Sequence, residues 1–174
     1  MNNKNILKLI LPVLFVVFGQ NCEKGLAPIA GFEGRISLPI DSTTGQVIWP
    51  DSLTGAVVVI AEFQYPLYTS VDSFFAHIVT YSDPLDLTRP VQDYFLQAPP
   101  GVFLGGIVAL KNIPIMEVMF SPRDSLTAHP EYFKPLGIYK PVGSTLPAGT
   151  IGISEEEITS DIDMQVDFNF VLPF

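Results

Sequence analysis

The chain has 174 residues, 48% of them hydrophobic, and its 18 acidic and 9 basic side chains give a formal net charge of −9 at pH 7. This acidic balance argues against binding to nucleic acid and against electrostatic attraction to anionic lipid headgroups. The length fits a signal segment and one domain. A single cysteine, Cys22, excludes a disulfide within the chain.

The N-terminus has the pattern of a targeting segment. Lys4 and Lys8 precede an apolar run over residues 9–18, which is about half the length that spans a bilayer. Cys22 follows shortly after the run. The arrangement resembles the signal of bacterial lipoproteins, and this implies that Cys22 becomes the lipidated N-terminus. Asn21 stands where that family usually has a small residue, and the alternative is an ordinary secretory signal.

This resemblance implies a division of the chain into three parts. We expect a signal peptide over residues 1–21, a tether over residues 22–30 and one domain over residues 31–174. The expected location is the cell envelope, with the protein held by its lipid on the periplasmic or the outer-membrane face.

Two early stretches of the domain predict strands. Residues 32–38 alternate apolar and polar side chains, as a half-buried strand does, although Gly34 interrupts the apolar row. Residues 39–52 form a turn-rich connection. Residues 56–63 are β-branched and almost continuously apolar, which predicts a central strand.

The middle of the chain predicts a β-hairpin. Residues 71–75 fit one helical turn and residues 76–81 a strand. Residues 91–97 and 102–110 then predict two strands, with Pro99-Pro100-Gly101 between them. Because proline has no N–H to donate and glycine accepts positive φ, we expect a turn here and antiparallel pairing of the two strands.

The last third of the domain is predicted to be extended and loop-rich. Short extended segments are expected at residues 115–120, 137–139 and 150–153, with a loop over residues 121–135. Residues 162–170 alternate most cleanly and predict a strand with one face in the core. The strongest strands predict these core residues: Val57, Val59, Tyr94, Leu96, Ile162, Val166 and Phe168. Short strands without a sustained helical period predict an all-β, antiparallel two-sheet sandwich.

Several of these segments together resemble transthyretin-like, or carboxypeptidase-regulatory-like, β-sandwich domains. They are Gly34-Arg35-Ile36, residues 56–61, Pro99-Pro100-Gly101 followed by Phe103, and the closing alternating strand. The resemblance implies about seven strands in two sheets, and it implies no activity. The hydroxyisourate hydrolases of this fold end in a Tyr-Arg-Gly-Ser type tail, which is absent here, so that activity is not expected.

Aromatic side chains in or beside loops are the candidate binding residues. Trp49, Tyr132 and Tyr139 would stack against a sugar or a partner if they shared one exposed face. The alternative is that such rings fill the open ends of the sandwich.

No motif predicts catalysis, a metal site or a cofactor. His77 and His129 lie far apart without a cysteine pair, and Glu155, Glu156 and Glu157 lack the spacing of a calcium loop. We therefore expect a non-catalytic envelope protein with a structural or protein-binding domain, or alternatively a carbohydrate- or small-ligand-binding module. The expected partners are the membrane, through the lipid, and an envelope protein or glycan.

Overall fold

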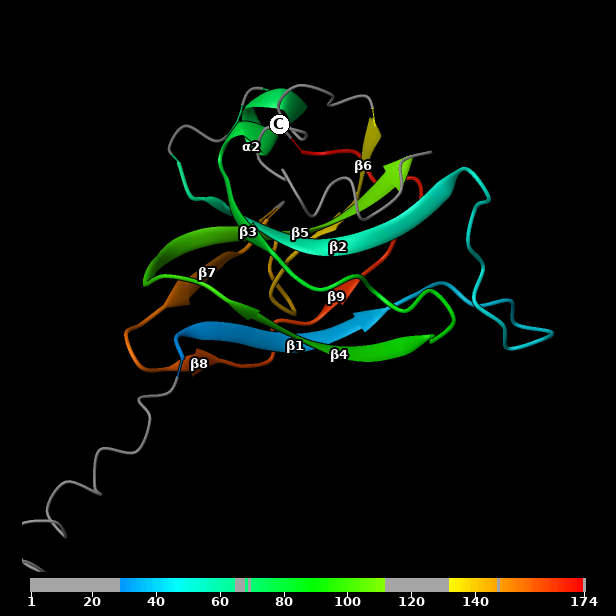
Figure 1. The fold of residues 1–174 in the computed structure, drawn as a ribbon, viewed down its shortest axis with the longest axis horizontal. Helices are drawn as coiled ribbons and strands as arrows, with labels where there is room; N and C mark the ends of the chain where they lie inside the picture. Colours follow the sequence, from blue (N-terminus) through cyan, green and yellow to red (C-terminus); the bar gives the residue numbers. More distant parts are fainter. Residues whose placement is uncertain (1–28, 65–67, 69, 112–131, 147, 174) are drawn as a thin grey trace, which may run out of the picture.

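The computed structural model describes residues 29–64, 68, 70–111, 132–146 and 148–173. Within these ranges the chain forms two stacked β-sheets, with a short helix on the outer side of the second sheet (Figure 1). The predicted all-β two-sheet sandwich is therefore confirmed. The expected signal peptide, Cys22 and the strand expected over residues 115–120 lie outside the described residues.

The first sheet is built around β1 (Gly31–Ser37). β4 (Val91–Gln97) runs antiparallel along one side of β1 and pairs Gln97 with Gly31 and Val91 with Ser37. β8 (Ile158–Thr159) and β9 (Met164–Gln165) run parallel to β1 on its other side. The expectation of antiparallel pairing throughout therefore fails for these two short strands.

The second sheet has two long antiparallel strands at its centre, β2 (Leu53–Glu62) and β5 (Gly101–Lys111). β3 (Ile78–Tyr81) borders β2. The other edge of β5 is shared end to end by β6 (Phe133–Ile138) and β7 (Thr150–Ile153). The described residues thus contain nine strands, against about seven expected from the sequence.

Two hydrophobic cores explain why β2 and β5 are apolar on both faces. Ala56, Val58 and Ile60 face the first sheet. Val57 and Val59 face the opposite way and pack with the helix α2 (Val71–Ala76) and with Leu172 near the C-terminus. The described part of the chain therefore has three layers (Figure 1).

The predicted core residues are buried with one partial exception. Six of the seven are at most 8% exposed, and Phe168 is half-buried at the rim of the core between the sheets. The expected helical turn is also present as α2, where the hydroxyl of Ser70 caps the helix by accepting a hydrogen bond from the Ser73 N–H.

The predicted hairpin between β4 and β5 is wrong, because the two strands belong to different sheets. The Ala98 N–H donates to the carbonyl of Ala30 and extends the pairing of β4 with β1. Pro99 and Pro100 have no N–H for this ladder, so it ends there and the chain crosses to the second sheet. Gly101 has a φ of 158°, close to ordinary extended backbone, and opens β5 opposite Ile153.

The long strand predicted over residues 162–170 is also wrong, although its side chains alternate between buried and exposed as far as Asp167. Only Met164 and Gln165 pair regularly with β1. The segment then leaves the first sheet, because the Val166 N–H donates to Ser37 while the next N–H, of Asp167, donates to Leu136 in β6. The chain therefore links the two sheets along one side of the sandwich.

Candidate functional site

Trp49 serves as a packing residue at the edge of the core. Its indole N–H donates to the Leu53 carbonyl at 2.7 Å, and its ring meets Phe168 edge-on with 5.4 Å between ring centroids. The ring also packs against the core between the sheets. Both its polar atom and a large part of its surface are therefore used within the domain.

Tyr132 and Tyr139 lie at opposite ends of β6. Tyr132 immediately precedes the strand and is 38% exposed, whereas Tyr139 immediately follows it and packs against the core between the sheets. A strand of this length separates the two residues by roughly 20 Å. The backbone of Tyr139 is bonded on both sides, since its N–H donates to Gly105 and its carbonyl accepts from Gly149.

The candidate rings therefore do not form one binding surface. Trp49 contacts Phe168, Tyr139 lies beside Gly105 and Gly149, and Tyr132 is a strand length away from Tyr139. The arrangement agrees with the alternative interpretation for Trp49 and Tyr139, in which the rings close the rim of the core.

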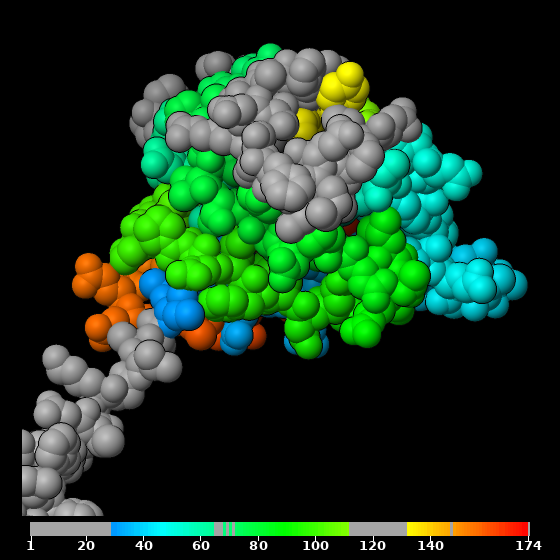
Figure 2. Space-filling view, in the orientation of Figure 1, coloured from blue at the N-terminus to red at the C-terminus, as the bar shows by residue number. Residues whose placement is uncertain are grey.

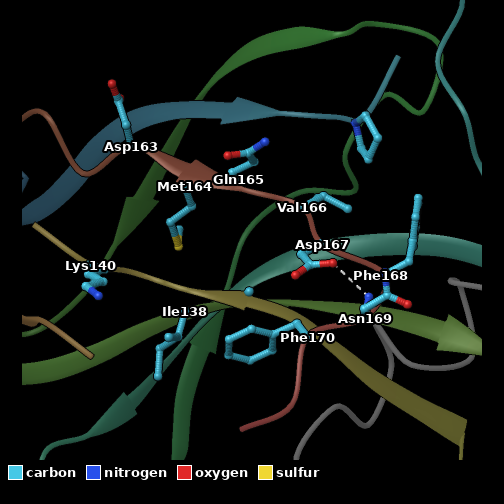
Figure 3. A pocket seen from close by; sticks show the side chains of 12 residues that line it. Ile138, Lys140, Asp163, Met164, Gln165, Val166, Asp167, Phe168, Asn169 and Phe170 are labelled. Carbon is cyan, nitrogen blue, oxygen red and sulfur yellow. Dashed lines mark hydrogen bonds between the residues drawn. The ribbon is translucent and has the colours of Figure 1, made fainter. Parts of the chain in front are cut away.

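Residues 162–170, which link the two sheets, are called the crossing segment below. The described residues contain an open groove of about 600 Å³ between β6 and this crossing segment (Figure 3). Ile138, Met164 and Phe170 give it apolar walls, while Lys140 and Asp163 lie toward one end. The remaining lining residues are Pro39, Gly137, Gln165, Val166, Asp167, Phe168 and Asn169. Neither Trp49 nor either candidate tyrosine lines this groove.

The charged side chains around the groove are held by local interactions. Asp163 accepts a hydrogen bond from the Arg35 backbone N–H at 2.8 Å and lies 3.8 Å from the Arg35 guanidinium. Both side chains are more than half exposed, so their ion pair adds little stability. Asp167 accepts from the Asn169 N–H at 2.8 Å, which orders the turn at the other end (Figure 3).

Histidines and carboxylates form no cluster in the described part of the chain. The Nδ1 atom of His77 lies 2.7 Å from the Ser73 carbonyl, at the C-terminal end of α2, which is a structural role. Glu155, Glu156 and Glu157 are exposed on the turn between β7 and β8. In the part of the chain that the structure describes, no group of three or more His, Cys, Asp or Glu is placed to hold a metal ion. His129 lies outside the described residues.

A cluster missed from the sequence ties the first sheet to the crossing segment. Gly34 lies opposite Tyr94 in the sheet, and a Cβ added to Gly34 would come 2.2 Å from the Ile162 carbonyl oxygen. The hydroxyl of Tyr94 donates to that same oxygen at 2.6 Å. Burial raises the pKa of Tyr94, so the phenol stays neutral and remains a donor. The available sequence signal was the glycine that interrupts the apolar row of β1.

Neither a membrane-spanning helix among the described residues nor a similarity to known proteins identifies the function of this chain. Among the described residues there is no helix long and apolar enough to cross a membrane. Comparison with protein-family models, with curated proteins and with solved structures finds no match to this chain.

Proposed function

We propose that the protein is a non-catalytic, lipid-anchored envelope protein whose β-sandwich serves as a structural or protein-binding module. The main observation in favour of this function over sugar binding is that Trp49, Tyr132 and Tyr139 lie apart, and that two of them pack against the core. A stacking site for a sugar needs rings on a common exposed face. The groove in Figure 3 lacks all three of them.

The lipid anchor is supported by the sequence. Cys22 follows the short apolar run and precedes a short tether that contains Gly25 and Pro28. We expect the wild-type chain to sediment with membranes, to require detergent for release and to carry labelled fatty acid. Cys22→Ser should lose the label and the detergent-dependent membrane association. Unchanged labelling and partition in Cys22→Ser would refute the anchor.

β4 forms the edge of the first sheet among the described residues, and this edge supports a protein-binding role. The Leu38 N–H donates to Pro90 and the Ala98 N–H donates to Ala30, so the even-numbered residues of β4 direct their backbone groups toward β1. The odd-numbered residues between them direct their N–H and C=O groups away from β1. Such an edge accepts a partner strand by backbone pairing.

The alternative is a carbohydrate- or small-ligand-binding module. Trp49 is the only tryptophan in the chain and reports on any ligand that stacks there. The non-catalytic module predicts no change in its fluorescence on titration with soluble glycans. A saturable change that is abolished by Tyr139→Ala, in a chain that still melts cooperatively, would favour the alternative.

We also propose that the domain is related to transthyretin-like β-sandwich domains. The two-sheet architecture with an apolar central β2 supports it. The segment around Pro99-Pro100-Gly101 supports it as a connection between sheets, no longer as a hairpin.

A further inference from the structure

One end of the sandwich gathers the start of the domain and several strand ends. Gly31, at the start of β1, pairs with Gln97 at the end of β4 and with Ile158 in β8. β5 begins at the same end, because Gly101 follows β4 after three residues and pairs with Ile153. In Figure 2 the blue start of the described chain lies beside the orange segment that precedes and includes β8.

Apolar side chains are exposed at this end from both sheets. The Phe63 N–H donates to the Val102 carbonyl, which places these two residues together where β2 ends and β5 begins. Val79 in β3 and Gln97 in β4 line a common hollow beside Pro99. The tether-end rim is the following set of residues, each 39–55% exposed: Ile29, Phe63, Val79, Phe95, Val102 and Ile158.

The tether fixes this end close to the proposed anchor. Residues 23–28 are all that separate Cys22 from Ile29, and a fully extended chain of that length spans at most about 25 Å. The opposite end, where Ile40 and Ile48 are exposed, lies a strand length further away. The rim is therefore the apolar surface that the anchor brings nearest to the bilayer.

We propose that the tether-end rim rests on the surface of a zwitterionic lipid bilayer, with its apolar side chains at the boundary between headgroups and acyl chains. The inference rests on the proposed lipid anchor. Apolar side chains at this depth contribute by burial of their area. The exposed carboxylates of Glu155, Glu156 and Glu157 on the turn before β8 oppose anionic headgroups, so the partner is zwitterionic lipid.

A tryptophan placed in β4 tests the contact. The lipidated mature chain, which begins at Cys22, is reconstituted into phosphatidylcholine vesicles with bromine in the upper acyl chain, as the native protein, as Phe95→Trp and as Val91→Trp. Val91 is the matched control, since it is 53% exposed on the same strand and the same face but at the other end. After subtraction of the native Trp49 signal, we expect about twofold or greater quenching at position 95 and little at position 91.

The lipid composition supplies a second arm. Replacing part of the phosphatidylcholine with phosphatidylglycerol should reduce quenching at position 95 at low salt, and added salt should restore it. A chain in which all three glutamates of the turn are replaced by glutamine should lose this sensitivity. Stronger quenching on anionic vesicles would contradict the assignment of zwitterionic lipid.

The outcomes separate this inference from the proposed anchor. Chains that fail to float with the vesicles refute both. Chains that float but show no quenching at position 95, or equal quenching at positions 91 and 95, refute the contact and leave the anchor. In the Phe95→Trp chain, shielding of the introduced indole from a soluble quencher by cell membranes, without shielding by protein-free vesicles, would assign the rim to a protein partner instead. Cooperative melting of both variants shows that the domain is intact.

Discussion

At the scale of single residues, the contact between Gly34, Tyr94 and Ile162 holds the crossing segment on the first sheet. The missing side chain of Gly34 makes room for the Ile162 carbonyl, which then accepts the hydroxyl proton of Tyr94. The alternation of side chains predicts that Tyr94 and Ile162 are buried, but it does not predict that they contact each other. Their contact depends on the path of the segment after β8, which side-chain alternation does not specify.

Gly34→Ala should destabilise the domain strongly. The new Cβ meets backbone atoms of Ile162, which can yield only if the crossing segment moves, so we expect a loss of about 2–4 kcal/mol in the free energy of unfolding. Gly152→Ala is the matched control, because a Cβ there meets nothing within 4 Å. Urea denaturation measures both variants. Equal stability of the two would show that the carbonyl of Ile162 does not lie over Gly34.

The buried tyrosines predict a stability that falls at high pH. Burial, with a smaller contribution from Glu62, raises the pKa of Tyr68 from 10.0 to about 12, and burial also raises the pKa of Tyr94. Folding favours the neutral form of both phenols. Their contribution to the free energy of unfolding is therefore complete at pH values below the pKa of the unfolded state, and it is lost as the pH rises through the pKa of the folded state. Unfolding titrations from pH 9 upward should therefore show a decline between pH 10 and about 12. Tyr68→Phe should make this decline smaller and leave the part that Tyr94 contributes. Parallel curves for Tyr68→Phe and the native chain would contradict the contribution of Tyr68.

At the scale of elements, the sequence located strands better than it paired them. β4 has the predicted bounds, and β1 and β2 differ from the predicted ranges by only a few residues at their ends. The pairing partners of the strands could not be predicted in the same way. The apolar side chains of β5 are compatible with any apolar strand as a neighbour, so they do not specify which strand pairs with it. Pro99 and Pro100 indicate only that a ladder stops, and both a hairpin and a crossing between sheets meet that condition.

The pairing of β4 with β1 predicts unequal losses of stability for proline at two adjacent positions. Asp93→Pro removes an N–H that points away from β1 and should cost less than about 1 kcal/mol relative to Asp93→Ala. Gln92→Pro removes an N–H directed at β1 and should cost about 3 kcal/mol relative to Gln92→Ala, a reference that also removes the side-chain bonds between Gln92 and Asp86. Thermal or urea unfolding measures all four variants. A larger loss in Asp93→Pro than in Gln92→Pro would reverse the assigned edge.

At the scale of the whole molecule, the fold class followed from the sequence but the third layer did not. Val57 and Val59 were correctly expected to be buried, yet they pack with α2 and not between the sheets. A strand covered on both faces shows no periodicity, so its sequence cannot indicate what covers each face. The placement of Trp49, Tyr132 and Tyr139 could not be predicted for a related reason, since residues near strand ends face the core or the solvent according to the tertiary path.

The most direct test of a lipid-anchored envelope module is the mass of the intact protein extracted from membranes with detergent. The expected species begins at Cys22 and carries fatty acyl groups on that residue, and its mass falls in steps of whole acyl chains on mild hydrolysis. The Cys22→Ser chain should yield no such species. A mature wild-type protein that begins after a different cleavage site, or that carries no lipid, would contradict the proposal and with it the contact between the tether-end rim and the bilayer.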